Sequence, residues 1–269
     1  MKSKLKKLQF VRNIYFSIHP LKSFFVFKPL LMLKQYKWFF RTFKNFKKEI
    51  NPSFSKIEFQ PCLFDNLSYT PLDPVYFYQD TWASKKIFEL KPKHHVDIGS
   101  NAKTVGIISQ FVPTTMVDIR PIKLKLNNLF FVKGSILNLP FKDNSVESVS
   151  SLCVVEHIGL GRYGDKIDVY GSEKAISELK RVVKVGGVIL FSVPVDKENK
   201  VYYNAHRAFT RDYILSLFDN FKLIEEKYQY GGAIYDKYDP DKGFGTGLFM
   251  FIKKEKWNVC KTKLFKKKN

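Results

Sequence analysis

The stretch His95-Val96-Asp97-Ile98-Gly99-Ser100-Asn101 decides the fold, together with a second stretch, Met116-Val117-Asp118-Ile119-Arg120. In each, a short apolar run reaches an acidic residue and then breaks into a polar or glycine turn. This is typical of a buried parallel strand that ends where a ligand can bind. Asp118 follows Gly99 by 19 residues, close to the offset of about 20 at which an acidic residue on the second strand of a nucleotide-binding βαβ unit reaches the ribose. The two strands therefore predict an adenosine-type ligand.

The residues after Gly99 indicate which adenosine ligand would fit. A dinucleotide fingerprint needs glycines along the turn, so that the backbone can approach a pyrophosphate. Here the next glycine is Gly106, and residues 100–104 are other types. S-adenosylmethionine (SAM) carries the same ribose without a phosphate and tolerates such a loop. We therefore favour SAM, with an ordinary strand-to-helix turn as the alternative interpretation.

Composition sets the size of the domain and argues against a metal site. At 269 residues, 45% of them hydrophobic and 16% aromatic, the chain can hold one α/β domain of ordinary size plus an extension. The three cysteines, Cys62, Cys153 and Cys260, are odd in number and widely spaced. They indicate neither a disulfide framework nor a zinc cluster, and they favour a reducing cytoplasm. We predict no metal ligands.

The formal charge of +21 is concentrated at the two ends of the chain. Residues 1–50 carry +12 and residues 253–269 carry +7, which leaves +2 for the 202 residues between them. The middle is a nearly neutral domain with basic ends. The charge therefore indicates where the protein sits rather than what it catalyses.

The first 50 residues form a basic N-terminal extension. They contain no apolar run of the ~20 residues needed to span a bilayer, and Lys22 and Lys28 argue against a cleaved signal peptide. From Leu30 to Ile50, aromatic residues recur at three- and four-residue steps while cations keep their own face. This amphipathic helix could lie in an anionic membrane interface. The alternative is a helix packed on the following domain with a solvated basic face.

The rest of the chain alternates strand and helix signals. Residues 51–93 are a connector or lid that leads into a helix at about Asp80 to Leu90, and the run Tyr76 to Asp80 either lines a site or belongs to the core. Residues 94–253 predict an α/β domain with a mostly parallel sheet and helices on both faces. Within it, Tyr230 to Gly245 is expected to be a long loop. Residues 254–269 are a basic tail.

The order of motifs resembles that of the class I SAM-dependent methyltransferases across residues 80–253. Strand-Asp-x-Gly and the acid after the second strand are followed by Leu139-Pro140-Phe141, Glu156-His157 and the sequence RVVKVGG at 181–187. The resemblance implies a Rossmann-like, seven-stranded sheet completed by an antiparallel pair. More specifically, IGLGRYGD at 158–165 and NAHR at 204–207 are similar to a methyltransferase-like family of unknown function, whose members occur in bacterial surface-polysaccharide gene clusters.

The resemblance also implies which residues would hold SAM. The loop after the first strand would lie beneath the methionine part, Asp118 would bind the ribose, and Ser135 with Ile136 would meet the adenine. The chain departs from the wider superfamily at Asn101 and Lys103, where further glycines are common, and at Ser135, where an aspartate is common. The cofactor-binding residues implied are Asp97, Gly99, Ser100, Asn101, Asp118, Ile119, Ser135, Ile136 and Cys153.

The implied reaction needs an aligned nucleophile and a proton acceptor, because the sulfonium methyl is already a good electrophile. The loop after the fourth strand faces that methyl in this fold. His157 is the preferred general base because imidazole titrates near neutral pH, and a structural histidine is the alternative. Arg162 and Arg207 could grip a phosphate or carboxylate of the acceptor, or form ion pairs with acids of the same loop. The candidate catalytic residues are His157, Glu156, His206, Arg162, Tyr163, Asp165 and Arg207.

We therefore expect a cytoplasmic SAM-dependent methyltransferase, peripheral at the inner face of the cell membrane, that O-methylates a sugar, nucleotide-sugar or surface-glycan intermediate. A nucleic-acid methyltransferase is one alternative, suggested by the charge. The fourth strand ends in Cys153-Val154-Val155-Glu156, however, and not in an amino-methylating motif of the Asn-Pro-Pro-Tyr type. The other alternative is a degenerate, membrane-associated Rossmann-like binding module. The sequence predicts no oligomeric state.

Overall fold

The computed structural model describes residues 28–54 and 56–255. The chain divides into two compact units between Pro71 and Leu72. The predicted connector over 51–93 is therefore shared: its first part belongs to the N-terminal unit, and its helix belongs to the α/β unit. The expectations for the first 27 residues and for nearly all of the basic tail lie outside the described residues.

The N-terminal unit contains the expected helix, α2 (Lys28–Phe46), which continues into a 3₁₀ turn, η2 (Lys47–Glu49). Its aromatic stripe is partly covered by Phe59 of the same unit. The Phe59 ring lies 5.8 Å from that of Phe39 and 4.8 Å from that of Phe43, and both of these are half-buried. Phe40 and Phe46 remain more than half exposed. In the described part of the chain, no helix is both long enough and apolar enough to cross a membrane.

The α/β unit is built on one eight-stranded sheet in the order β3-β2-β1-β4-β5-β10-β8-β9. Strands β1 to β5 run parallel, and β10 is antiparallel to both β5 and β8. The expected antiparallel pair is therefore confirmed, whereas the expected count of seven strands is wrong by one. The strands are β1 (His95–Ile98), β2 (Thr114–Asp118), β3 (Leu129–Lys133), β4 (Val146–Leu152), β5 (Val183–Val195), β8 (Phe221–Tyr230), β9 (Ala233–Tyr235) and β10 (Gly245–Lys253).

The additional strand, β9, lies inside the stretch that was expected to be a loop, 230–245. It pairs antiparallel with the end of β8 over three residues, from Tyr228↔Tyr235 to Tyr230↔Ala233. A short 3₁₀ turn, η4 (Pro240–Lys242), follows it. Gly231, with φ +57°, makes the tight reversal between the two strands. Three residues are too few for a period-two pattern to distinguish a strand from a polar loop.

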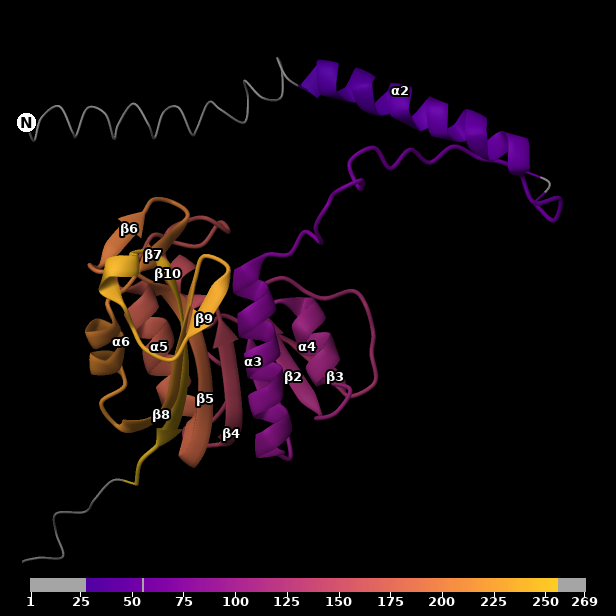
Figure 1. The fold of residues 1–269 in the computed structure, drawn as a ribbon. Helices are drawn as coiled ribbons and strands as arrows, with labels where there is room; N and C mark the ends of the chain where they lie inside the picture. Colours follow the sequence, from indigo (N-terminus) through magenta and orange to yellow (C-terminus); the bar gives the residue numbers. More distant parts are fainter. Residues whose placement is uncertain (1–27, 55, 256–269) are drawn as a thin grey trace, which may run out of the picture. The chain divides into compact units, whose positions relative to one another are not determined.

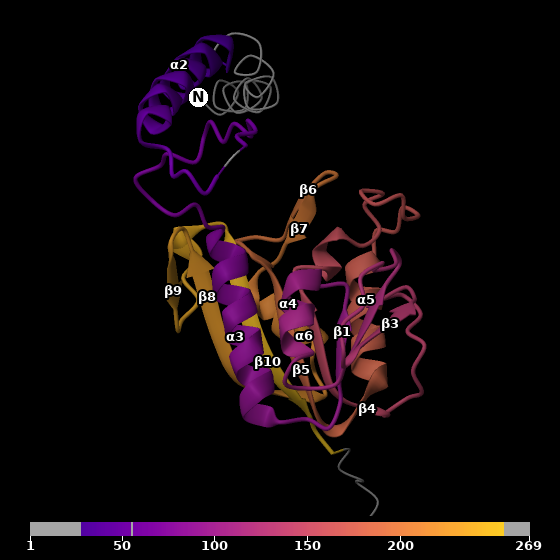
Figure 2. The same cartoon turned by 90° about the vertical axis from the view of Figure 1, so that its right-hand side faces the viewer.

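Helices cover both faces of the sheet, as predicted (Figure 1, Figure 2). α3 (Pro74–Leu90) and α4 (Ala102–Ile108) lie on one face, and α5 (Gly171–Val182) and α6 (Arg211–Leu217) lie on the other. Both faces of the sheet need to be covered because apolar side chains of the central strand β5 point alternately to its two faces, where they join two separate cores. Phe191 and Val193 belong to the core that includes α5 and α6, whereas Val188 and Leu190 belong to the core of α3 and α4.

The start of α3 is fixed by its cap. The Asp73 carboxylate accepts a hydrogen bond from the Val75 N–H at 2.9 Å, and Pro74 occupies the first helical position. The helix therefore begins before Asp80, where the sequence pattern placed its start. It ends at Leu90, and its C-cap residue Lys91 is left-handed at φ 47°.

The topology brings the ends of three strands together. β1 is flanked by β2 on one side and β4 on the other, all parallel, so their carboxyl ends reach one edge of the sheet. A 3₁₀ turn, η3 (Val155–His157), follows β4 at this edge. A separate hairpin of β6 (Lys200–Tyr202) and β7 (His206–Ala208) follows β5. These segments form the candidate site.

Candidate functional site

Two adjoining cavities open at the carboxyl ends of β1, β2 and β4. The smaller cavity, of about 130 Å³, is enclosed by these strand ends and by the turn after β3. The larger cavity, of about 640 Å³, extends to α3, the β6–β7 hairpin and the segment before β10. Both walls include Gly99, Asp118, Arg120, Cys153, His157 and Tyr163. Among the described residues, all of the expected cofactor-binding and catalytic residues except Asp97 and Arg207 therefore line one continuous space.

The loop after β1 is shaped from behind by Asp97. This carboxylate is fully buried and accepts hydrogen bonds from the Ser100 N–H at 3.0 Å and from the Ser150 hydroxyl at 2.5 Å. Burial raises its pKa to about 6. Among the described residues, Asp97 is not one of those that line either cavity. It holds the loop in place, whereas the expected contact was with the ligand itself.

Gly99 is the residue of this loop that faces both cavities. Its φ of +70° lies in the left-handed region, and a Cβ there would lie 3.1 Å from a methyl carbon of Val154. Glycine therefore keeps the loop close to the end of β4 and leaves the cavity open. Ser100 and Asn101 line the larger cavity, and the Asn101 side chain also caps α4 by accepting from the Lys103 N–H at 3.0 Å.

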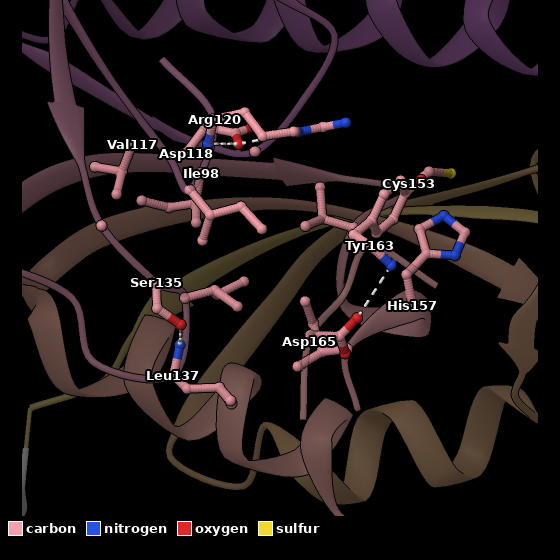
Figure 3. Close-up of a pocket in the computed structure, with 16 residues that line it drawn as sticks. Ile98, Val117, Asp118, Arg120, Ser135, Leu137, Cys153, His157, Tyr163 and Asp165 are labelled. Atoms are coloured by element: carbon pink, nitrogen blue, oxygen red, sulfur yellow. Dashed lines mark hydrogen bonds and ion pairs between the residues drawn. The ribbon is translucent and has the colours of Figure 1, made fainter. Parts of the chain in front are cut away.

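Asp118 stands at the end of β2 on the wall shared by the two cavities. Its side chain is 11% exposed, and its Oδ1 accepts a hydrogen bond from the Arg120 N–H at 2.7 Å. This bond fixes the carboxylate at the cavity edge. Figure 3 shows Asp118 and Arg120 on one side of the smaller cavity and His157 and Asp165 on another.

The smaller cavity is otherwise mostly apolar. Ile98, Val117 and Ile119 line it from β1 and the end of β2, and Ile136 lines it from the turn after β3. Ser135 shapes that turn, because its hydroxyl accepts from the Leu137 N–H at 3.2 Å. The expected adenine-contacting residues thus border a space suited to a flat apolar group.

Glu156 is the most unusual group of the larger cavity. Its side chain is 2% exposed, and burial raises its pKa to about 8. Its Oε2 is buried without a hydrogen-bond partner among the residues that the structure describes. An orphaned buried oxygen is rare in native proteins. A neutral carboxyl group at pH 7 is therefore available to a ligand in this cavity.

His157 lies beside Glu156 and is held by a backbone carbonyl. Its Nδ1 is 2.7 Å from the Ala205 oxygen, so we assign the proton to Nδ1, which donates to that carbonyl. Nε2 is then an acceptor, 3.7 Å from Glu156 Oε1. Burial lowers the pKa of His157 to about 4. The imidazole is therefore neutral at pH 7, with a lone pair on Nε2.

The IGLGRYGD loop folds back on itself, and this conformation requires glycine at Gly159 and is held by hydrogen bonds to the Asp165 carboxylate. Gly159 has φ +80°, and a Cβ there would overlap the Asp168 carbonyl oxygen. The Asp165 carboxylate accepts from the Gly159 N–H at 2.7 Å and the Tyr163 N–H at 3.2 Å. Burial would raise the pKa of Asp165, but these backbone hydrogen bonds outweigh it and lower the pKa. Asp165 therefore positions Tyr163, which lines both cavities.

Arg207 differs from its expected role in gripping the acceptor. Arg207 is buried, and among the described residues it is not one of those that line either cavity. Its Nη1 donates hydrogen bonds to the Ile158 carbonyl oxygen at 2.6 Å and to the Ser172 hydroxyl at 3.1 Å. Its Nη2 donates to the Asp168 oxygen at 3.1 Å. Arg207 thus ties the motif loop to the start of α5. Its neighbour His206 faces the larger cavity instead.

Two of the cavity residues, Arg120 and Phe244, were not predicted as site residues from the sequence. Arg120 follows Asp118 by two residues, but a lone arginine in a loop gives no signal of its own. Phe244 packs against His206 with ring centroids 5.4 Å apart. Tyr76 lines the larger cavity, and Gln79 of the same run is buried and accepts from the Ser192 hydroxyl. The run at 76–80 therefore serves both the site and the core.

Cys153 completes the shared wall at the end of β4. It is half-buried and left-handed at φ 52°, and burial raises the pKa of its thiol. The thiol is neutral at pH 7. Within the described residues, no group of three or more His, Cys, Asp or Glu side chains is arranged to hold a metal ion.

Comparisons with known proteins show the fold. Residues 134–232 match the family described as "Caenorhabditis protein of unknown function, DUF268", a span that includes both the IGLGRYGD and NAHR motifs. No curated protein sequence matches this chain.

Two solved structures carry the comparison of folds. A protein assigned as a sarcosine dimethylglycine methyltransferase from Galdieria sulphuraria is 14% identical, with a TM-score of 0.51, over 67% of this chain and 86% of that one. The N-methyltransferase NodS from Bradyrhizobium japonicum WM9 is 14% identical, with a TM-score of 0.50, over 68% and 98%. NodS has also been solved with S-adenosylhomocysteine; that structure is 14% identical, with a TM-score of 0.49, over 72% and 91%. The α/β unit has a Rossmann-like methyltransferase fold.

Proposed function

We propose that this protein is a SAM-dependent methyltransferase that O-methylates a sugar, nucleotide-sugar or surface-glycan intermediate. The observation that carries the proposal is the buried Glu156 carboxyl group, with one oxygen unpartnered in the described structure, beside the neutral His157 on the wall of the larger cavity. In a methyltransferase fold, such a pair on the acceptor side of the cavity could take up the proton that the acceptor hydroxyl loses, next to the space for the cofactor.

The chemistry of the smaller cavity fits SAM. Asp118 would accept hydrogen bonds from the ribose hydroxyls, and the apolar wall around Ile98, Val117 and Ile136 would take the adenine. Gly99 keeps the shared wall open, because a side chain there would meet Val154. When bound, SAM supplies an electrophilic methyl group. The chain itself has to orient the acceptor and take up its proton.

The environments of Glu156 and His157 favour Glu156 as the proton acceptor. A carboxylate with a pKa of about 8 is a much stronger base than an imidazole with a pKa of about 4. His157, the preferred base from sequence, is better suited to accept a hydrogen bond at Nε2 and to hold the acceptor hydroxyl in place. Because Glu156 ionises only near pH 8, methyl transfer is expected to accelerate as the pH rises toward that value.

The larger cavity is suited to a small acceptor. Its volume of about 640 Å³ lies within the ~300–1,000 Å³ typical of small-molecule sites. Aromatic rings of Tyr76, His206 and Phe244 line it beside the polar groups. Flat aromatic faces can pack against the C–H faces of a sugar ring, while the polar groups orient its hydroxyls.

We also propose that α2 contacts an anionic membrane surface. Its exposed Leu30, Leu33 and Phe40 accompany the exposed cations Lys34, Lys37, Arg41 and Lys44. Sedimentation with vesicles of anionic and of neutral lipid tests this proposal. Replacing these four cations by serine is expected to reduce binding to anionic vesicles, and unchanged binding would argue against α2 as the contact.

The reaction can be tested without knowing the acceptor. The full chain is incubated with methyl-labelled SAM and a cell extract separated into small-molecule, glycan and nucleic-acid fractions. We expect label in a sugar-containing fraction, and loss of that label in Glu156→Gln while SAM affinity persists. Glu178→Gln, which lies away from both cavities as described, serves as the control. Label in the nucleic-acid fraction would contradict the proposed substrate. SAM binding without any methyl transfer would contradict the proposed reaction.

A further inference from the structure

We infer that Arg120, Tyr163 and Arg162 form an oxyanion subsite in the larger cavity, which binds a phosphate or carboxylate group of the acceptor. This inference rests on the proposed function for the identity of its ligand. It goes beyond that function because it assigns a negative charge to the acceptor. Arg120, and not Arg207 as predicted from the sequence, would bind this group together with Arg162.

The two guanidinium groups come from different segments and meet at one ring. The Arg120 guanidinium lies 5.0 Å from the centroid of the Tyr163 ring, and that of Arg162 lies 5.2 Å from it. They are therefore no more than about 10 Å apart. All three side chains line the larger cavity, together with His157 and Glu156. An oxyanion bound by these guanidiniums would therefore lie in the same cavity as the proposed proton acceptor.

The charge of Arg162 is not neutralised locally. Within residues 28–54 and 56–255, no carboxylate oxygen lies within 4 Å of its guanidinium nitrogens. Burial first, and then the positive charge of Arg162, lowers the pKa of His206 across the same cavity. Among the described residues, the one carboxylate that Arg120 contacts is that of Asp118, with 3.5 Å between Nε and Oδ1. Two weakly compensated guanidiniums on the wall of one cavity favour the binding of an anion there.

Fixed backbone groups position both arms of this subsite. Nη1 of Arg162 donates to the Ala205 carbonyl at 2.9 Å and also lies 3.2 Å from His157 Nδ1, whereas Nε and Nη2 have no hydrogen bond to the described residues. The Tyr163 backbone is held by Asp165, and the Arg120 backbone is held by Asp118. Figure 3 shows Arg120 at the edge of the pocket, with its side chain extending past Asp118. A fixed backbone limits the positions that each side chain can reach, which reduces the entropy lost on binding.

Guanidinium groups suit this task because their planar forks match both phosphate and carboxylate oxygens. A neutral sugar would gain nothing from two such groups, whereas a sugar phosphate, nucleotide-sugar or sugar acid would. The subsite would therefore select an acidic acceptor and place its hydroxyl near Glu156 and His157.

The test uses calorimetry on the full chain at physiological salt, with inorganic pyrophosphate and glucuronate as probes and S-adenosylhomocysteine as an independent ligand. The test variant is Arg120→Gln/Arg162→Gln. Its matched control, Lys142→Gln/Lys222→Gln, removes two exposed charges of the same unit outside the described cavity walls. We expect the test variant to bind at least one probe about tenfold more weakly than the wild type, and the control within about twofold of it. Tyr163→Leu should weaken probe binding several-fold.

Each outcome bears on the subsite. Pyrophosphate binding alone would identify a phosphorylated acceptor, and glucuronate binding alone would identify a carboxylate. Equal loss in the test and control variants, or no probe binding by the wild type, would overturn the subsite. If S-adenosylhomocysteine binds while both probes fail, only the subsite is wrong. If the probes bind through the two arginines and S-adenosylhomocysteine does not, the proposed function fails and the anion site stands.

Discussion

Replacing Glu156 by glutamine should stabilise the protein, and the gain should grow with pH. In the folded protein, burial raises the pKa of Glu156 to about 8 from its ordinary value of 4.5. Below pH 4.5 the carboxyl group is protonated in both the folded and the unfolded state, and it contributes no pH dependence. Between pH 4.5 and 8 the folded state keeps a proton that the unfolded state releases. The free energy of unfolding therefore falls as the pH rises through this window.

The size of the effect follows from the same interval. Each pH unit in the window costs about 1.4 kcal/mol, so the interval from 4.5 to about 8 sets an upper limit of about 5 kcal/mol. Relaxation of the structure and entry of water around the ion reduce this penalty. Glutamine keeps the shape of the side chain and does not titrate. We expect Glu156→Gln to be more stable than the wild type by about 2 kcal/mol at pH 8, and by almost nothing at pH 4.5.

Urea denaturation of both proteins between pH 4.5 and 8.5 measures this difference. Glu178→Gln is the control with the opposite sign, because hydrogen bonds from Arg181 lower the pKa of Glu178. Glu178 therefore contributes stability above its unfolded pKa that is lost as the pH falls, and its replacement should destabilise the protein at pH 7. A stability difference for Glu156→Gln that does not change with pH would refute the assigned burial and protonation of Glu156.

Three further predictions concern the motif loop and its neighbours. Gly159→Ala should cost about 1–3 kcal/mol of stability, because alanine disfavours φ +80° and its Cβ would meet a carbonyl; Gly232→Ala, with open space around it, should change stability by less than about 0.5 kcal/mol. Arg207→Leu should lower the thermal midpoint by several degrees, because it leaves the Ile158 carbonyl without this donor; an unchanged midpoint would contradict its role in tying down the loop. The ring nitrogens of His157, followed by NMR, should remain in the neutral form down to pH 5, because the pKa of about 4 lies below that. A titration midpoint above pH 6 would show that the ring is not buried as described.

Much of the fold could be predicted from the sequence because its signals are local. The apolar runs ending in Asp97 and Asp118 form neighbouring parallel strands, β1 and β2. β9 could not be predicted, because its three residues are too few to show the alternation of apolar and polar residues that indicates a strand. The start of α3 was misplaced because its cap at Asp73 precedes a run of aromatic residues that could equally have been loop or core.

The candidate site could be predicted only in part, because motif letters do not say which way a side chain faces. His206 and Arg207 are adjacent in one strand, so their side chains point to opposite sides, and only one of them reaches the cavity. Asp97 and Asp118 end neighbouring strands, yet only Asp118 lies on the cavity wall in the described structure. The charge states of Glu156 and His157 depend on burial, which the sequence does not show.

Calorimetry with S-adenosylhomocysteine, on the wild type and on Asp118→Ala, tests the central claim most directly. We expect the wild type to bind one molecule per chain, and Asp118→Ala to bind about 10- to 100-fold more weakly, because each hydrogen bond to a charged group contributes about 1.5–3 kcal/mol. Asp212→Ala, whose carboxylate is 95% exposed and lies outside both cavities as described, should bind like the wild type. No binding by the wild type, or equal binding by the wild type and Asp118→Ala, would contradict a SAM site at the ends of β1, β2 and β4.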